Sequence, residues 1–331
     1  MKNNKVTIND IAAALSVSSV SVSRALSGQT GVGEELKNKI IEKAKELGYE
    51  KSKKADQFNI LVLHQKPYKE DNSNFSSMVQ GVEKFLQNTN SDYSVEFVDN
   101  DNQKQLTLPY KLSKGIQFDG AILIGRFTLK YLSFIQGKID NLVFFTGYYP
   151  SVDCDCIRFN FVNAGYKLCE LLIKKGHTKI GFIGNSRFIR NKESILGITT
   201  ALEDYKLPSK NEYFIPSEAE YSSSLIELIR TANLPSAFIC EDDIKAVELM
   251  KFLTSQKIKV PGDVSVIGSG NTDISSLSTP TLTTLDLNLE YACQAVVETL
   301  LKRITNPNKP YENIAILSSL IERESVKSLR S

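Results

Sequence analysis

The sequence has few of the residues from which metal and catalytic sites are usually built. Its 331 residues include only two histidines, His64 and His177, and five cysteines. A structural zinc site needs four closely spaced ligands, and the close pair Cys154 and Cys156 has no second pair to complete one. We therefore expect no metal, and the odd cysteine count favours reduced thiols over a disulfide framework.

Long apolar runs are also missing. No stretch approaches 18 consecutive apolar residues, and the N-terminus MKNNKVTIND has no apolar segment of the kind a secretory leader needs. We expect a cytoplasmic protein with no membrane partner. A chain of this length can bury a large core without disulfides or metals.

Familiar catalytic motifs are absent as well. The chain contains no GxxxxGK[ST], HExxH or GxSxG. The segment GSGNTD at 268–273 offers Gly-x-Gly after an expected strand, but Asp273 stands where a dinucleotide fingerprint needs its third glycine. We therefore expect no enzyme activity and no cofactor.

Charge is unevenly distributed. Residues 1–58 hold ten basic and seven acidic side chains, whereas the remainder holds 30 basic and 31 acidic ones. A basic head on a near-neutral body fits a nucleic-acid module joined to another domain. A solvated helix surface would give the same imbalance, so charge alone leaves both readings open.

Three helices are predicted in this head. The first covers about 7–15, where Thr7 and Asp10 resemble a capping box and apolar residues recur at helical spacing. After a short turn, Ser18 is a good N-cap for the second. The third covers about 33–47, with acidic residues in its first turn and lysines near its end.

The stretch VSSVSVSRAL at 17–26 fits two periods. Strict alternation would make it a strand, but no partner strand is near and an isolated strand is marginal in water. As a helix it buries Val22, Ala25 and Leu26 on one face, and Gly28 ends it. We interpret it as a helix. Its other face carries small side chains and one arginine: Ser19, Val20, Ser23, Arg24 and Ser27.

Two short helices joined by a three-residue turn, followed by a third, are the layout of a helix-turn-helix. The second helix of that motif enters the major groove of double-stranded DNA. Serines allow close approach to the groove, Val20 suits a thymine methyl, and Arg24 can reach a guanine edge or a phosphate. The alternative is a three-helix packing module that binds no DNA. That alternative does not explain the exposed serine, valine and arginine side chains of the second helix.

After a lysine-rich linker, the pattern alternates between short apolar strands and helices. Strands are expected at 59–64, 93–99, 119–125, 141–148, 179–184, 212–216, 236–240 and 263–268. Helices are expected near 76–88, 105–115, 128–137, 163–175, 192–205, 221–232, 243–256 and 288–304. The apolar segment IAILSSLI near the C-terminus could be a strand that crosses back between lobes. The fold class is therefore α/β: a small all-α head, then two doubly wound parallel lobes with a ligand cleft beyond their strand ends.

Several ordered segments carry a family resemblance over nearly the whole chain. The head reads TINDIAAALSVSSVSVSRALSG and then GVGEELKNKIIEKAKELGY. The later segments are FDGAILIG, LLIKKGHTKIGFIG, VPGDVSVIG, TPTLTTLDLN and LIERES. Together they resemble the LacI/GalR family of bacterial transcription regulators. The resemblance implies a homodimer on a pseudo-palindromic DNA operator and a periplasmic-binding-protein-like core. It also implies repression of carbohydrate-utilisation genes, modulated by a small-molecule effector that is a sugar or sugar derivative.

The resemblance also implies domain limits. We expect a helix-turn-helix domain at 1–48, a short basic linker at 49–58, and an effector-binding and dimerisation core at 59–331. Within the core, lobe one takes about 59–158 plus 288–314, and lobe two takes about 159–287 plus 315–331.

Carried onto this sequence, the resemblance makes Ser18 the cap of the recognition helix, with Ser19 and Val20 as its base-reading pair. The DNA-binding candidates are Thr7, Ser18, Ser19, Val20, Ser21, Ser23, Arg24, Ser27, Lys51, Lys53 and Lys54. The family places Pro-Asn and a hinge helix after Gly-Tyr, and that hinge inserts a leucine into the minor groove. Here EKSKKADQ follows instead, so we expect no wedge and phosphate contacts from the linker lysines.

The effector cleft departs from the family too. Where an arginine usually stands three residues before a glycine, this chain has Ser194 before Gly197, and a usual polar ligand is lost at Gly270. The remaining effector-binding candidates are Phe75, Asn160, Phe161, Arg190, Ser194, Asp242 and Asn271. Two alternatives stay open. One is the same regulator controlled by a partner protein or by no ligand, and the other is a solute-binding protein, which the basic head opposes.

Overall fold

The computed structural model describes residues 8–27, 32–47, 57–65, 75–147, 151–217 and 221–330. The chain separates into two compact units, Met1–Gln57 and Phe58–Ser331. Each unit has its own hydrophobic core. No helix in the described residues is long and apolar enough to cross a lipid bilayer.

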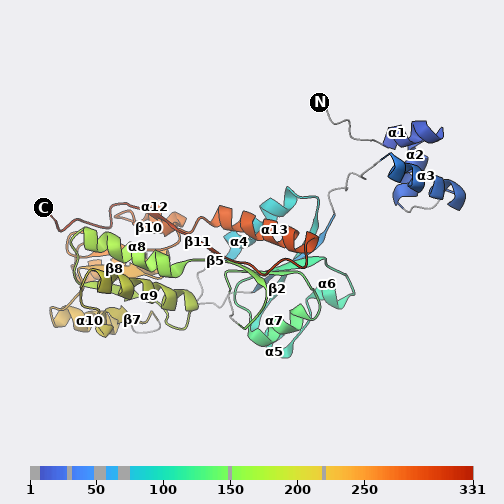
Figure 1. The fold of residues 1–331 in the computed structure, drawn as a ribbon. Helices are drawn as coiled ribbons and strands as arrows, with labels where there is room; N and C mark the ends of the chain where they lie inside the picture. The colour runs from blue at the N-terminus through green and yellow to red at the C-terminus, as the bar shows by residue number, and fades with distance from the viewer. Residues whose placement is uncertain are drawn as a thin grey trace, which may run out of the picture. The chain divides into compact units, whose positions relative to one another are not determined.

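The first unit is a cluster of three helices. They are α1 (Ile8–Leu15), α2 (Ser19–Ser27) and α3 (Glu34–Glu46) (Figure 1). The helical interpretation of VSSVSVSRAL is therefore confirmed. Val22 and Ala25 of α2 are buried against α1 and α3, with Ile11 and Ile40 among the buried neighbours. Packing of this apolar stripe outweighs the period-two pattern of the sequence.

The turn between α1 and α2 is fixed by local hydrogen bonds. Ser16 adopts a left-handed φ of 54°, and the Val17 amide donates to the Ala12 carbonyl at 3.0 Å. Ser18 Oγ then accepts a hydrogen bond from the Ser21 amide at 3.0 Å. This is the N-cap that the sequence predicts, and it orients the start of α2.

Lobe one of the second unit is built on a parallel six-stranded sheet in the order β11-β5-β4-β3-β1-β2. Its strands are β1 (Asn59–Gln65), β2 (Asp92–Val98), β3 (Gly120–Ile124), β4 (Leu142–Phe145), β5 (Asp155–Phe159) and β11 (Asn313–Ile316). Its helices are α4 (Phe75–Gln87), α5 (Asn100–Gln105), α6 (Tyr110–Ser113), α7 (Leu129–Gln136) and α13 (Leu289–Thr305).

Both faces of this sheet are covered. Ile60 and Val62 of β1 face α4 and α13, whereas Leu61 and Leu63 face the side of α7 (Figure 1). This explains why the strand reads as a continuous apolar run, as expected for a buried parallel strand.

Lobe two has a parallel four-stranded sheet in the order β7-β6-β8-β9. Its strands are β6 (Ile180–Ile183), β7 (Phe214–Ile215), β8 (Ala237–Cys240) and β9 (Ser265–Ile267). Its helices are α8 (Phe161–Lys174), α9 (Ile189–Asp204), the 3-10 turn η1 (Asn211–Tyr213), α10 (Tyr221–Arg230), α11 (Asp243–Ser255) and α12 (Asp273–Leu277). An antiparallel pair, β10 (Thr284–Asp286) and β12 (Ser319–Ile321), completes the lobe.

The described chain passes between the lobes three times, from β5 to α8, from β10 to α13 and from β11 to β12. The crossovers are tied together. The Asn160 amide donates to the Ile316 carbonyl at 2.9 Å, and Asn288 Nδ2 donates to the Leu317 carbonyl at 2.8 Å. The three segments therefore form one connected hinge region.

Three sequence expectations for this unit are wrong. The helix at 105–115 is instead two short helices, because Leu106 turns left-handed with φ 55° and Pro109 starts α6. Strand β5 is not among the expected strands. The segment IAILSSLI does cross between lobes, but as two strands in different sheets rather than one.

Candidate functional site

The first candidate surface is the face of α2 that points away from the three-helix core. Ser19 and Arg24 are exposed on this face, and Ser21 is half-buried. The side chains of Val20, Ser23 and Ser27, and all of Thr7, Lys51, Lys53 and Lys54, lie outside the described residues. An exposed helix with small residues and one arginine has the shape and chemistry that a major groove accepts.

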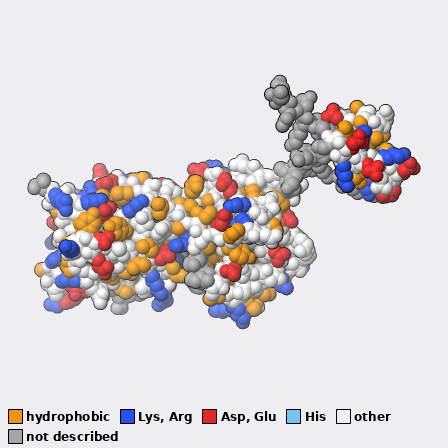
Figure 2. Space-filling view, in the orientation of Figure 1, with side chains coloured by type: hydrophobic (Ala, Val, Ile, Leu, Met, Phe, Trp, Pro, Cys, Tyr) orange, Lys and Arg blue, Asp and Glu red, His pale blue; other side chains and the backbone are white. Residues whose placement is uncertain are grey.

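Helix α3 differs from α2 in its charges. Three of its four lysines pair with glutamates on the same helix: Lys37 with Glu34, Lys39 with Glu35 and Lys43 with Glu46. Figure 2 accordingly shows basic and acidic side chains interspersed on this unit. Helix α2 contains no acidic residue, so its face can approach a phosphate backbone without repulsion.

The second candidate site is a cavity of about 1350 Å³ between the two lobes. Lobe one contributes Arg126 and Thr146, which follow β3 and β4. Lobe two contributes Asp242 and Asn271, which follow β8 and β9. This is the position beyond the carboxyl ends of parallel strands that the sequence predicts for a ligand.

The predicted effector residues divide into two groups. Phe161, Arg190, Asp242 and Asn271 line the cavity. Asn160 does not line it but caps α8, accepting from the Asn163 amide at 2.9 Å. Ser194 also lies off the cavity, and its hydroxyl donates to the Arg190 carbonyl at 3.0 Å. The side chain of Phe75 lies outside the described residues.

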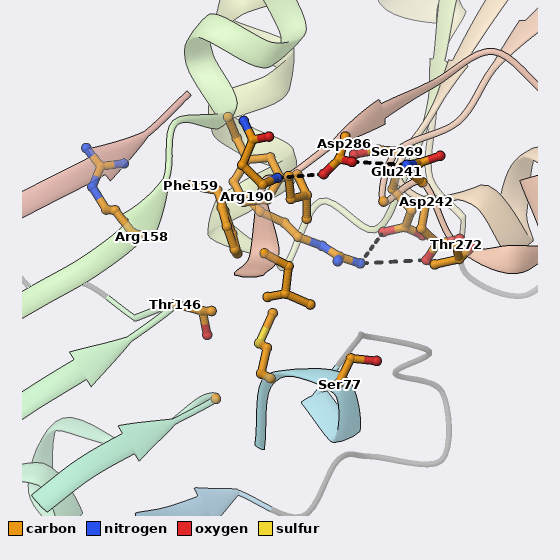
Figure 3. A pocket seen from close by; sticks show the side chains of 18 of the residues that line it. Ser77, Thr146, Arg158, Phe159, Arg190, Glu241, Asp242, Ser269, Thr272 and Asp286 are labelled. Atoms are coloured by element: carbon orange, nitrogen blue, oxygen red, sulfur yellow. Dashed lines mark hydrogen bonds and ion pairs between the residues drawn. The ribbon is translucent and has the colours of Figure 1, made fainter. Parts of the chain in front are cut away.

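Arg190 points toward two carboxylates of its own lobe, on the lobe-two wall of the cavity (Figure 3). Its Nη2 lies 3.7 Å from Glu241 Oε2 and 3.8 Å from Asp242 Oδ2. Both distances exceed that of a direct hydrogen bond. The guanidinium is therefore held by charge attraction and can still donate to acceptor oxygens of a ligand.

One carboxylate oxygen of Asp242 caps a helix, and the other points toward the cavity. Its Oδ1 accepts from the Lys245 amide at 2.8 Å and caps α11, while Oδ2 faces Arg190. Burial raises the pKa of Asp242, against the opposing effects of the Lys245 amide and Arg190. The carboxylate therefore gains from a ligand that donates hydrogen bonds to it.

Glu241 is a cavity residue that the sequence reasoning missed. Its carboxylate accepts from Asn191 Nδ2 and from Ser217 Oγ, each at 2.5 Å, and its side chain is only 6% exposed. The signal was available, because Glu241 directly follows β8, at the strand end where ligands are expected.

Asp286 is also missing from the predicted set. Asn271 Nδ2 donates to Asp286 Oδ2 at 3.0 Å, and Arg323 Nη2 donates to Asn271 Oδ1 at 2.8 Å. Both ends of the Asn271 amide are therefore engaged within the protein. Neither histidine is among the described residues that line the cavity.

Comparison with known proteins decides the family. Residues 7–52 match the family described as "Bacterial regulatory proteins, lacI family", and residues 169–326 match a "Periplasmic binding protein-like domain". The chain is 26% identical to the "Ribose operon repressor" of Haemophilus influenzae, covering 98% of this chain and 99% of that protein. It is 27% identical to the "Probable HTH-type transcriptional repressor ExuR" of Bacillus subtilis, with the same coverage.

The chain belongs to the LacI family. Its fold matches a lac repressor dimer bound to operator and an anti-inducer, with a TM-score of 0.68, 18% identity, and coverage of 98% of this chain and 100% of that one. It also matches a transcriptional regulator CelR–cellobiose complex, with a TM-score of 0.70, 18% identity, and coverage of 97% and 100%. This LacI-family protein is a DNA-binding transcription regulator and not an enzyme, which confirms the regulator hypothesis.

Proposed function

We propose that this LacI-family protein is a cytoplasmic repressor of carbohydrate-utilisation genes that binds a pseudo-palindromic operator as a homodimer. A sugar or sugar derivative in the interlobe cleft changes its affinity for DNA. One observation carries the proposal: the same chain holds a helix-turn-helix unit with an exposed second helix and a two-lobed cavity with polar walls. A ligand that prefers one lobe arrangement shifts DNA affinity by that preference and no more.

The cavity chemistry supports a hydroxyl-rich ligand. Arg190 can donate to hydroxyl oxygens, Asp242 can accept from hydroxyl hydrogens, and Phe161 offers an apolar face. Similar proteins are named for ribose and described in complex with cellobiose. A ligand with hydroxyls on one side could bond to Arg190 and Asp242, while carbon-bound hydrogens on its other side pack against Phe161.

On the DNA side, we propose that Ser19 and Val20 read bases while Arg24 contacts a base or a phosphate. Lys51, Lys53 and Lys54 add phosphate contacts in place of a minor-groove wedge. Such contacts make affinity depend steeply on salt.

A gel shift of the full chain on DNA from upstream of its own gene tests operator binding. The expected result is a discrete complex that a truncation lacking residues 1–50 does not form. Equal binding by the truncated chain would refute the assignment of the DNA-binding unit.

Isothermal titration against a panel of sugars and nucleosides tests the effector. Heat of binding from a sugar supports the proposal. Weaker binding of that sugar by the Asp242→Asn variant would locate its binding site in the interlobe cleft. Silence across the panel would favour control by a partner protein or by no ligand, with DNA binding unchanged.

A further inference from the structure

Arg126 and Phe188 meet across the interlobe cleft. The guanidinium carbon of Arg126 lies 3.6 Å from the centroid of the Phe188 ring. Arg126 belongs to lobe one, in the loop after β3, and Phe188 is the N-cap residue of α9 in lobe two. Both line the cavity. An arginine stacked on an aromatic face is attracted by the ring quadrupole, so this contact draws the lobes together.

Each partner is fixed to its own lobe. The Arg126 amide donates to Gln65 Oε1 at 2.8 Å, and the Arg126 carbonyl accepts from Gln103 Nε2 at 3.2 Å. Both glutamines are buried. The Phe188 amide donates to the Asn185 carbonyl at 3.1 Å. Because neither backbone can follow the other lobe, separation of the lobes must break the contact.

A second interlobe contact lies close to the hinge. Arg158 Nη1 donates to Glu193 Oε1 at 3.1 Å. Arg158 sits in β5, the strand that runs directly into the crossover to α8. In the sheet, β4 separates β5 from β3. Adjacent strands lie about 4.8 Å apart, so the Arg126 loop is roughly 10 Å farther from that crossover.

Rotation about the crossovers therefore moves the two contacts by different amounts. Arg158 and Glu193 are near the pivot and can stay close. Arg126 and Phe188 lie on a longer lever arm and must part first.

We propose that Arg126 and Phe188 form a latch that holds the interlobe cleft closed in the absence of effector. This inference rests on the proposed role of the cleft as an effector site. Loss of a cation–π contact of this kind raises the opening equilibrium by about 2- to 30-fold. The latch can change the DNA affinity of the effector-free protein by at most the same factor.

The test uses a fluorescent reporter inside the cleft. The chain contains no tryptophan, so Phe161→Trp supplies a single emitter. Phe161 lines the cavity and packs against Phe159, with ring centroids 6.2 Å apart. Acrylamide, a neutral quencher, then measures access to the cleft in the full chain without DNA or effector.

In this reporter chain, Arg126→Ala is expected to raise the acrylamide quenching constant. Phe188→Leu breaks the same contact from the other lobe and is expected to do the same. Lys130→Ala removes an exposed cation from nearby α7 and is expected to leave quenching unchanged. Thermal melting of each variant confirms that it is folded.

Unchanged quenching in both folded variants, Arg126→Ala and Phe188→Leu, would overturn the latch. An equal rise with Lys130→Ala would overturn it too, since the effect would then reflect charge alone. Because the measurement contains neither operator nor sugar, its outcome is independent of whether the effector proposal succeeds.

Discussion

Arg303 and Asp155 form a two-pronged ion pair inside lobe one. Arg303 Nε donates to Asp155 Oδ2 at 2.7 Å, and Nη2 donates to Oδ1 at 3.1 Å. Lys309 Nζ and the Glu312 amide also donate to Oδ1, each at 2.7 Å. Asp155 is completely buried, so its charge is stabilised by these donors rather than by water. The network fastens the segment between α13 and β11 to the start of β5.

Asp155→Asn is expected to lower the free energy of unfolding by about 3–5 kcal/mol, because it leaves the charge of Arg303 buried without its carboxylate and leaves Lys309 with Glu312 alone. Urea unfolding of the full chain measures the change. Asp153→Asn is the matched control, since Asp153 is exposed two residues away. A loss below 1 kcal/mol for Asp155→Asn would contradict this account.

The same carboxylate gives a pH dependence. Burial alone would raise the pKa of Asp155, but hydrogen bonds from Arg303, Lys309 and the Glu312 amide lower it below its usual value. Its contribution to stability is therefore complete above the unfolded-state pKa of about 4 and is lost as pH falls through the lower folded value. Unfolding midpoints of Asp155→Asn should vary less with pH below 4 than those of the unmodified chain.

Ser18 is expected to stabilise α2 through its cap. Ser18→Ala removes the acceptor of the Ser21 amide and should cost about 1 kcal/mol of local stability. Amide hydrogen exchange over residues 19–27 in the full chain measures the loss as faster exchange. Ser18→Asp keeps a good N-cap and should restore protection, and failure of this rescue would argue against capping as the cause.

Arg24 and Ser19 should affect DNA binding in different ways. Arg24→Ala is expected to weaken every operator variant by about 1–3 kcal/mol, and a reduced salt slope would indicate a lost phosphate contact. Substitution of Ser19 should instead change which operator is preferred. Fluorescence anisotropy on operators altered at single base pairs separates the two patterns. A uniform loss for Ser19 variants would exclude base reading at that position.

Asp242 combines a cost in stability with a proposed role in binding. Burial raises its pKa. The cost of burying the charged form is therefore absent below the unfolded pKa, where the carboxyl is protonated in both states, and it grows as pH rises through the folded value. Asp242→Asn stays neutral and still caps α11, so it should be more stable than the unmodified chain at pH 7 and bind effector more weakly. Asp273→Asn, an exposed cavity residue, should change stability little. Chemical unfolding at pH 4 and pH 7 checks the sign.

Sequence periodicity predicted most helices and strands because their burial follows regular spacing. Strand β5 was not predicted, because its sequence DCIRF contains Asp155 and Arg158, which interrupt the apolar run. Their charges are paired with residues distant in sequence, Arg303 and Glu193. Such long-range compensation leaves no local signal in a single sequence.

The cleft shows the same division. Its location followed from strand polarity, and four of the candidate residues do line it. Asn160 and Ser194 were misplaced because one caps a helix and the other bonds back to its own helix. Arg126 and Phe188 were not candidates at all, since only the folded lobes bring the two loops together.

The three crossovers have a consequence for synthesis of the chain. Lobe one lacks α13 until residue 305 and β11 until residue 316 have been synthesised, by which time the four-stranded sheet of lobe two has already been translated. Before then, Val62 and its neighbours on one face of β1 are missing part of their cover. Nascent chains should therefore expose this apolar surface until α13 and β11 have been synthesised, which makes them prone to aggregation during that interval.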